Sequence, residues 1–243
     1  ILTRLQKQDY KTSQITTQTT QLASDNRYAH DVKQVDADSP ARFNADPTRL
    51  YEASGSAGKV CVFAVRLDTF EKIPSQVFYV GTNSHDDLTE IRRFLLKDLP
   101  RLPIAGEYIH RVAYDIGAEY GKDTFMFIEK LGTAKVPAAF AMKDKVDAYL
   151  EKFGMKGLSD KVLQLITKFL PNHLPKRMNA FRDLYEHHLV IRIENQDVEQ
   201  VESFLKRYFQ DKTSGDFFHC SEEEGRKAFL HRFAVAGAAI RYR

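Results

Sequence analysis

The sequence predicts an α+β fold, in which a small antiparallel sheet with helices on one face is interrupted by a basic helical insertion. Two observations carry this prediction. A strand followed by a helix occurs before residue 100, and the same pattern returns after residue 187. Between these halves, residues 110–184 show apolar side chains at helical spacing and a cluster of basic residues. Two strand–helix halves that share one sheet form the split βαβ arrangement, with antiparallel neighbours.

The composition sets the class of protein. The 243 residues are 43% hydrophobic and 28% charged, which is close to the average of globular domains and excludes a wholly disordered chain. No apolar run approaches the ~18 residues that a membrane-spanning helix needs. Cys61 and Cys220 are the only cysteines, which favours a reducing compartment. Since the net charge is only +3, binding to polyanions would have to come from local clusters.

The first 67 residues contain a polar part and an apolar segment. Residues 1–47 are rich in polar side chains, and we expect an irregular surface or part of a domain whose other half is missing. A loop with Gly55 and Gly58 then leads into residues 59–67, where apolar side chains occupy both alternating faces. This pattern predicts a strand buried on both sides. The loop is not a typical phosphate cradle, because such loops follow a strand and open a helix.

Both strand–helix halves can be placed from their apolar patterns. In the first half, residues 76–80 form a strand and Ser84 offers an N-cap to a helix that Pro100 ends. In the second half, residues 188–193 form a strand, 197–210 a helix and 216–220 a further strand. The helical stripes expected to face the sheet are Leu88, Ile91, Leu95 and Leu99, and Val198, Val201, Phe204, Leu205 and Tyr208.

The insertion is expected to consist of helices separated by glycine and proline. Gly121 and Gly154 break the first helical patterns, and Pro171 ends an amphipathic helix over residues 158–170 that Ser159 can cap. A last helix starts after Pro175.

The basic segment, residues 152–182, is the most informative feature of the insertion. It carries a local net charge of +6, from seven basic residues and the single acid Asp160. A basic face joined to an apolar helical face is typical of a helix that lies in a membrane interface. The alternatives are a solvated helix face on the protein's own core and binding to nucleic acid. Nucleic acid is disfavoured, because no aromatic side chains alternate with the basic residues in a strand.

The histidines do not predict a metal site or a catalytic centre. His187 and His188 are adjacent, so a strand would point them to opposite faces, and no metal-binding spacing occurs elsewhere. The pair His231–Arg232 could face an anionic substrate, although a structural role at a helix end is the stronger hypothesis. No arrangement for nucleophilic catalysis can be assembled, so no catalytic residue is assigned in this chain.

Several long stretches together resemble the respiratory, quinone-dependent D-lactate dehydrogenases. They include YGKDTFMFIEKLGT at residues 120–133 and EGRKAFLHRFAVAGAAIRY at residues 224–242. The others lie, in the family's order, at residues 39–70, 105–111, 174–182 and 185–188. The similarity runs over nearly the whole chain, and only about the first 30 residues match loosely.

The resemblance implies a domain organisation. The family has an FAD-binding domain of the vanillyl-alcohol-oxidase type, a cap domain over the substrate and a membrane-binding region inserted in the cap. By analogy this chain is the middle portion of such a protein. Residues 1–67 would end the FAD-binding domain, 68–109 and 185–223 would form the cap, 110–184 the membrane-binding insertion, and 224–243 the start of the segment that returns towards the membrane and flavin regions.

The resemblance also implies an activity. The family oxidises D-lactate to pyruvate and passes electrons through FAD to a membrane quinone, as a peripheral protein on the cytoplasmic face of the inner membrane. The expected partners are therefore D-lactate, quinone and an anionic phospholipid surface, without nucleic acid. Two alternatives stay open: a non-enzymatic α+β module with a basic arm for anionic lipid or nucleic acid, and the cap of a flavoenzyme for another 2-hydroxy acid.

Site residues follow from the same resemblance. Residues 58–62 are similar to a glycine-then-strand element of the family, in which the residue that matches Val62 contacts FAD through its backbone. The family's main pyrophosphate-binding loops precede Ile1 and its histidine-rich active-site segment follows Arg243, so the chain alone is expected to hold FAD poorly and to be inactive. The predicted membrane-binding residues are Lys152, Lys156, Lys161, Lys168, Lys176, Arg177 and Arg182.

Overall fold

The structure is a computed structural model that describes residues 27–37, 59–62, 68–155, 157–159, 162 and 170–241. The chain divides into two compact units. The first unit comprises Ile1–Ile73 with Leu96–Asp98, and the second comprises Pro74–Leu95 with Leu99–Arg243. In the first unit, the described residues include the short helix α2 (Tyr28–Lys33).

A four-stranded antiparallel sheet forms the centre of the second unit. Its strands are β1 (Ser75–Thr82), β2 (Ala105–His110), β3 (His187–Glu194) and β4 (Gly215–His219), in the order β2-β3-β1-β4. Every neighbouring pair is antiparallel. A helix separates β1 from β2 in the sequence, and another separates β3 from β4. The predicted split βαβ arrangement with an antiparallel sheet is therefore confirmed.

One face of the sheet is covered by the two helices that the sequence predicts. These are α3 (His85–Arg93), continued by the π-helical η3 (Phe94–Asp98), and α9 (Val198–Phe209), which follows the short η5 (Asn195–Asp197). The Oγ of Ser84 accepts a hydrogen bond from the backbone N–H of Asp86, which confirms the N-cap. Ile91, Leu95 and Leu99 lie in a core with Val201 and Leu205.

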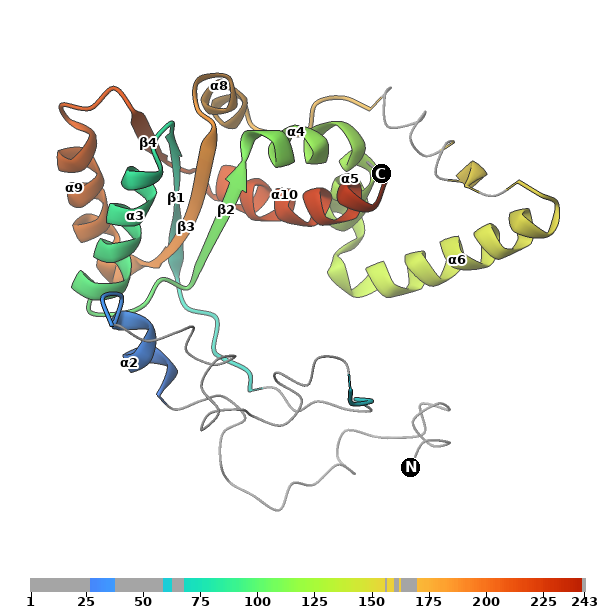
Figure 1. The fold of residues 1–243 in the computed structure, drawn as a ribbon, viewed down its shortest axis with the longest axis horizontal. Coiled ribbons are helices and arrows are strands. Elements are labelled where there is room, and N and C mark those ends of the chain that lie inside the picture. The colour runs from blue at the N-terminus through green and yellow to red at the C-terminus, as the bar shows by residue number, and fades with distance from the viewer. Residues whose placement is uncertain are drawn as a thin grey trace, which may run out of the picture. The chain divides into compact units, whose positions relative to one another are not determined.

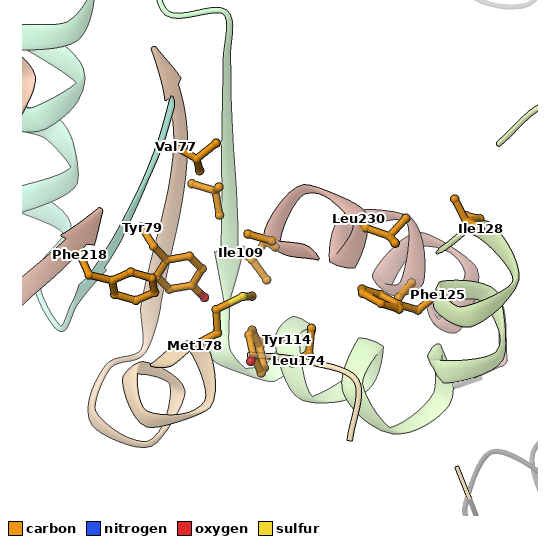
Figure 2. Close-up of a cluster of buried hydrophobic side chains, with 13 residues drawn as sticks. Val77, Tyr79, Ile109, Tyr114, Phe125, Ile128, Leu174, Met178, Phe218 and Leu230 are labelled. Carbon is orange, nitrogen blue, oxygen red and sulfur yellow. The ribbon is translucent and has the colours of Figure 1, made fainter. Parts of the chain in front are cut away.

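The opposite face is also covered, so the prediction of helices on one face only is wrong. This second layer consists of α4 (Arg111–Tyr120), α5 (Lys122–Leu131), α8 (Lys176–Leu184) and α10 (Glu222–Arg241) (Figure 1). Alternating residues of β1 point to the two layers, so that six consecutive residues of this strand are buried. Tyr79 and Phe218 lie in the second core with Met178, Tyr114 and Phe125 (Figure 2).

Glycines allow α4 to approach α10 closely. A Cβ added at Gly121 would lie 2.5 Å from the carbonyl oxygen of Ala234, and one at Gly117 would lie 2.6 Å from Val235 Cγ2. Gly121 also separates α4 from α5, as the sequence predicts. Three helices from the predicted insertion, α4, α5 and α8, therefore share a core with α10 and the sheet.

The remainder of the insertion contains η4 (Thr133–Lys135) and α6 (Val136–Lys152). Gly154, at a φ of 75° that favours glycine, follows the end of α6. The amphipathic helix predicted over 158–170 lies largely outside the described residues. Helix α8 begins directly after Pro175, which confirms that predicted boundary.

The segment predicted as a buried strand differs from that prediction where it is described. Residues 59–62 are exposed and form no strand, and residues 63–67 lie outside the described part of the chain. A strand requires a neighbouring strand to satisfy its backbone N–H and C=O groups. None of the described residues of the first unit forms a strand that could pair with this segment. The apolar pattern of residues 59–62 is therefore not sufficient to make them a strand.

Candidate functional site

The predicted membrane-binding lysines that the structure describes are exposed. Lys152 lies at the end of α6, and Lys176 opens α8. Lys156, Lys161 and Lys168 lie outside the described residues. A role of these lysines in membrane binding therefore stays a prediction. The side chains of Lys152 and Lys176 are accessible to a binding partner.

The two arginines of the basic segment are engaged within the protein. Arg182 donates two hydrogen bonds to the carboxylate of Asp115 on α4, each 2.6 Å long. Arg177 pairs with Glu224 at the start of α10 and also donates to the carbonyl oxygen of His219, 2.9 Å away. Hydrogen bonds to the carboxylates raise the pKa of both guanidinium groups. Both arginines thus connect α8 to neighbouring elements, and part of their charge is compensated.

Four large apolar side chains of α6 and its C-cap face solvent, and we call them the α6 stripe. Met142, Val146, Tyr149 and Phe153 keep 68%, 46%, 62% and 62% of their surface exposed. The rings of Tyr149 and Phe153 lie 5.2 Å apart between centroids. At 3.6 residues per turn, these four positions fall within a sector of about 60° on the helix.

Charged side chains of α6 are arranged around the α6 stripe. The same helical spacing places Lys145 and Lys152 along one edge of the stripe and Lys143 along the other. The acidic side chains lie on the opposite side of the helix, at Asp144, Asp147 and Glu151. Lys143 also donates a hydrogen bond to Asp147, 2.7 Å away. A helix with an apolar face bordered by lysines has the pattern of an interfacial membrane helix.

Sequence reasoning concentrated on residues 152–182 and did not single out the α6 stripe. Its signal is nevertheless present in the sequence, as apolar residues spaced four, three and four apart with lysines beside them. Exposure is what distinguishes this stripe from a buried helix face, and only the structure supplies it.

Val62 is the one predicted flavin contact that the structure describes. It is 52% exposed, and its segment, residues 59–62, belongs to no helix or strand. A contact of Val62 with FAD therefore stays a prediction. The expectation that this chain alone would hold FAD poorly stays a prediction as well.

His231 lies in the middle of α10 and not at a helix end, which corrects that expectation. The side chain is fully buried, and its Nε2 lies 3.2 Å from the carbonyl oxygen of Tyr114. Burial and the nearby His173 lower the pKa of His231 to about 3. Arg232 forms an ion pair with Glu107 and lies over the ring of Phe233. A neutral, buried His231 carries no positive charge for an anionic substrate at neutral pH.

His173 and His188 extend this buried group around Tyr114. The ring of Tyr114 lies 4.6 Å from that of His231 and 5.5 Å from that of His188, and His173 lies 6.1 Å from His231. Burial lowers the pKa of His173 and of His188 to about 4 each. Neither ring nitrogen of His173 has a hydrogen-bond partner among the described residues. Sequence spacing could not reveal this group, because its members come from a loop, β3, α4 and α10.

His187 faces the other layer of the sheet, as predicted for neighbours in a strand. Its ring lies 4.1 Å from that of His85 and 5.4 Å from that of His110, and its Nδ1 lies 2.8 Å from the hydroxyl of Tyr108. Burial, then His85 and His110, lower the pKa of His187. Within the described part of the chain, no group of three histidine, cysteine or acidic residues is arranged to hold a metal ion.

A search of the described helices for a membrane span finds none that is long and apolar enough.

Comparison with known proteins places this geometry in context. Three relatives are each named quinone-dependent D-lactate dehydrogenase. The one from Escherichia coli (strain K12) is 54% identical over 223 residues, the one from Haemophilus influenzae 50% over 247, and the one from Corynebacterium glutamicum 41% over 246. The matches cover 90%, 100% and 99% of this chain but 39%, 43% and 43% of the relatives. The chain thus spans about two fifths of the length of these curated relatives.

A family model gives the same result. The family described as "D-lactate dehydrogenase, membrane binding" matches residues 77–243, which include all of the sheet except the first two residues of β1, both helical layers and the α6 stripe. The resemblance found in the sequence is confirmed by these comparisons. The chain belongs to the membrane-binding family of D-lactate dehydrogenases.

Proposed function

We propose that this chain forms the cap and membrane-binding part of an enzyme that oxidises D-lactate to pyruvate and passes the electrons to a membrane quinone. The observation that carries this proposal is the identity of 41–54% with quinone-dependent D-lactate dehydrogenases over 90% or more of the chain. The non-enzymatic binding module is not favoured, because no comparison points to it and the family model names a dehydrogenase.

The cofactor of this proposal is FAD, and residues 1–67 would complete a flavin domain of the vanillyl-alcohol-oxidase type. The chemistry that FAD supplies when bound is acceptance of a hydride from the substrate carbon and delivery of electrons to quinone. The contribution of this chain is Val62, an exposed residue whose backbone would contact the cofactor. No catalytic residue is proposed among the described residues.

The membrane role is proposed as peripheral association with the cytoplasmic face of the inner membrane. A quinone resides in the bilayer, so an enzyme that reduces it must be held at the surface. The exposed Lys152 and Lys176 would attract anionic headgroups, together with Lys156, Lys161 and Lys168. Each basic residue near an anionic leaflet contributes about 1 kcal/mol, so five of them suffice for reversible binding.

Vesicle sedimentation tests the membrane role. A variant in which Lys152, Lys156, Lys161, Lys168 and Lys176 become Gln should lose at least about a hundredfold in affinity for phosphatidylglycerol-containing vesicles at low salt. Arg177 and Arg182 stay unchanged, because their loss would also break ion pairs within the fold. The matched control removes five exposed basic residues elsewhere, at Lys59, Lys72, Arg92, Lys206 and Arg207. Equal binding of both variants would refute the proposal.

A chimera tests the enzymatic role. The segment of the Escherichia coli relative that matches this chain is replaced by this chain, and D-lactate-dependent reduction of a soluble quinone analogue is measured. We expect a yellow protein that produces pyruvate and reduces the analogue. A folded, vesicle-binding chimera that is colourless and inactive would contradict the flavoenzyme proposal, while the parent relative serves as the positive control.

A further inference from the structure

We propose that the α6 stripe inserts between the acyl chains of the bilayer and gives this chain a hydrophobic, salt-resistant membrane contact in addition to its charge. The inference rests on the proposed membrane role and goes beyond it. It assigns Met142, Val146, Tyr149 and Phe153 as anchoring residues. The first three precede the basic segment, and Phe153 lies at its beginning.

The first argument is the exposure of these side chains. All four keep about half or more of their surface exposed, although they lie on one side of α6 and its C-cap. Large apolar side chains that are exposed singly are common on protein surfaces, but a contiguous row marks a surface that contacts an apolar partner. In the described chain, this row is formed by one helix face and needs no rearrangement to become available.

The second argument identifies the partner as a lipid surface. Lys145 and Lys152 border the α6 stripe along one edge, where their long side chains can reach headgroup phosphates while the apolar face enters the acyl region. Asp144 and Glu151 lie on the far side of the helix and would remain in water. This arrangement of charges favours the orientation in which the α6 stripe faces an anionic leaflet. Rotation of the helix by 180° about its axis would instead bring the carboxylates to the lipid phosphates.

The third argument is the chemistry of the side chains. Tyr149 combines an apolar ring with a polar hydroxyl, which suits the boundary between headgroups and acyl chains. Phe153 and Met142 have no polar group that insertion would leave without a partner. The acidic side chains of α6 equal its lysines in number, since the helix carries three of each, so attraction to anionic lipid cannot come from the net charge of this helix.

A single-tryptophan experiment tests insertion directly. The chain contains no tryptophan, so Phe153→Trp provides a unique reporter on the stripe. On phosphatidylcholine–phosphatidylglycerol vesicles we expect a blue shift of its emission and quenching by lipids brominated on the acyl chains. The control is Phe70→Trp, at a phenylalanine that is 83% exposed in the first unit, which should show neither effect. An unshifted, unquenched reporter at residue 153 on bound protein would overturn the inference.

A substitution experiment measures the contribution to affinity. Replacing Met142, Val146, Tyr149 and Phe153 by Gln keeps good helix formers on an exposed face, so folding should be preserved. We expect vesicle affinity to fall roughly tenfold or more at low salt, and residual binding to disappear at about 1 M salt, where charges are screened within ~3 Å. The matched control carries Gln at four exposed apolar residues outside the stripe, Phe70, Ile73, Ile104 and Val112, and should retain the binding of the unmodified chain.

The outcomes separate this inference from the proposed function. If the unmodified chain does not bind vesicles at any salt concentration, both fail. If it binds but high salt releases it completely, and the stripe variant binds as well as the control, the membrane role stands and the inserted stripe is refuted. If light scattering shows that the stripe variant loses self-association while its vesicle binding is unchanged, the stripe contacts a second copy of the chain and the inference is overturned.

Discussion

A buried carboxylate, Asp87, joins the end of β1 to α9 and the loop that precedes β4. It is 2% exposed and accepts hydrogen bonds from Thr82, Tyr208, Lys212 and Ser214, at 2.6–2.9 Å. Burial alone would raise the pKa of Asp87, but these hydrogen bonds outweigh it and lower the pKa to about 2. Such a group stabilises the fold only while it is ionised and all of its donors are satisfied.

We therefore expect Asp87→Asn to reduce the free energy of unfolding by about 3 kcal/mol, because the amide cannot accept from every donor. Urea unfolding would show this as a lower midpoint at an unchanged slope. The control is Asp211→Asn, at an exposed position, which should change the free energy by less than about 0.5 kcal/mol. Equal stability of the two variants would show that the hydrogen bonds at Asp87 contribute nothing net.

The buried histidines make stability depend on pH. The folded-state pKa values of His173 and His188 are about 4 and that of His231 about 3, below the ordinary value of 6.5. Between about pH 6.5 and 4, the unfolded chain thus binds protons that the folded chain does not. The contribution of these histidines to the free energy of unfolding should be fully present above pH 6.5. It should fall as the pH is lowered, by up to about 1.4 kcal/mol per pH unit for each group.

The measurement is urea unfolding at several pH values between 7 and 4. His188→Phe, which keeps an aromatic ring between Tyr79 and Tyr114, should show a shallower loss of stability than the unmodified chain. A profile that is flat down to pH 4 in the unmodified chain would contradict neutral burial of these rings.

At the scale of elements, close contact between α4 and α10 depends on Gly121. Its φ of −105° is accessible to any residue, so the effect of a larger side chain is steric alone. A Cβ there would lie 2.5 Å from a backbone oxygen of α10, which cannot rotate away. Gly121→Ala should therefore cost about 2 kcal/mol, seen as a lower thermal midpoint.

The matched control for this prediction is Gly106→Ala in the edge strand β2. No atom lies within 4 Å of a Cβ added there, so the midpoint should stay the same or rise slightly. A similar decrease in both variants would mean that general backbone effects, and not the contact with α10, explain the result.

The elements also show what the sequence could predict. Strands β1, β3 and β4 were found because β-branched and aromatic residues dominate them. Strand β2 was missed, since it is a half-exposed edge strand that contains Gly106. The second helical layer was missed because α10 carries charged residues among its apolar ones, and the pattern does not tell which sheet face such a helix covers.

The candidate site was predictable only in part, for a related physical reason. Local charge clustering is visible in a sequence, whereas the carboxylates that engage Arg177 and Arg182 are distant along the chain. The α6 stripe has a readable spacing, but core helices share that spacing. Exposure and long-range pairing, which decide between membrane contact and structural support, require the folded molecule.

For the molecule as a whole, both hydrophobic cores lie in the second unit. Among the described residues, every buried apolar side chain lies between Val77 and Ala238. We expect residues 74–243 to fold without the preceding part and to unfold in one transition at the midpoint of the full chain. Circular dichroism during heating would measure this, and a broad or strongly lowered transition would show that the first unit stabilises the second.

The pairing of β2 with β3 has an evolutionary consequence. His110 and His187 are partners in the ladder, so the chain leaves the sheet and returns to it at neighbouring positions. The entropic cost of closing such an excursion rises only slowly with its length. Because α4, α5 and α8 share a core with the sheet and α10, the stretch between α5 and α8 is the part of this excursion whose length can change while the strand register is kept.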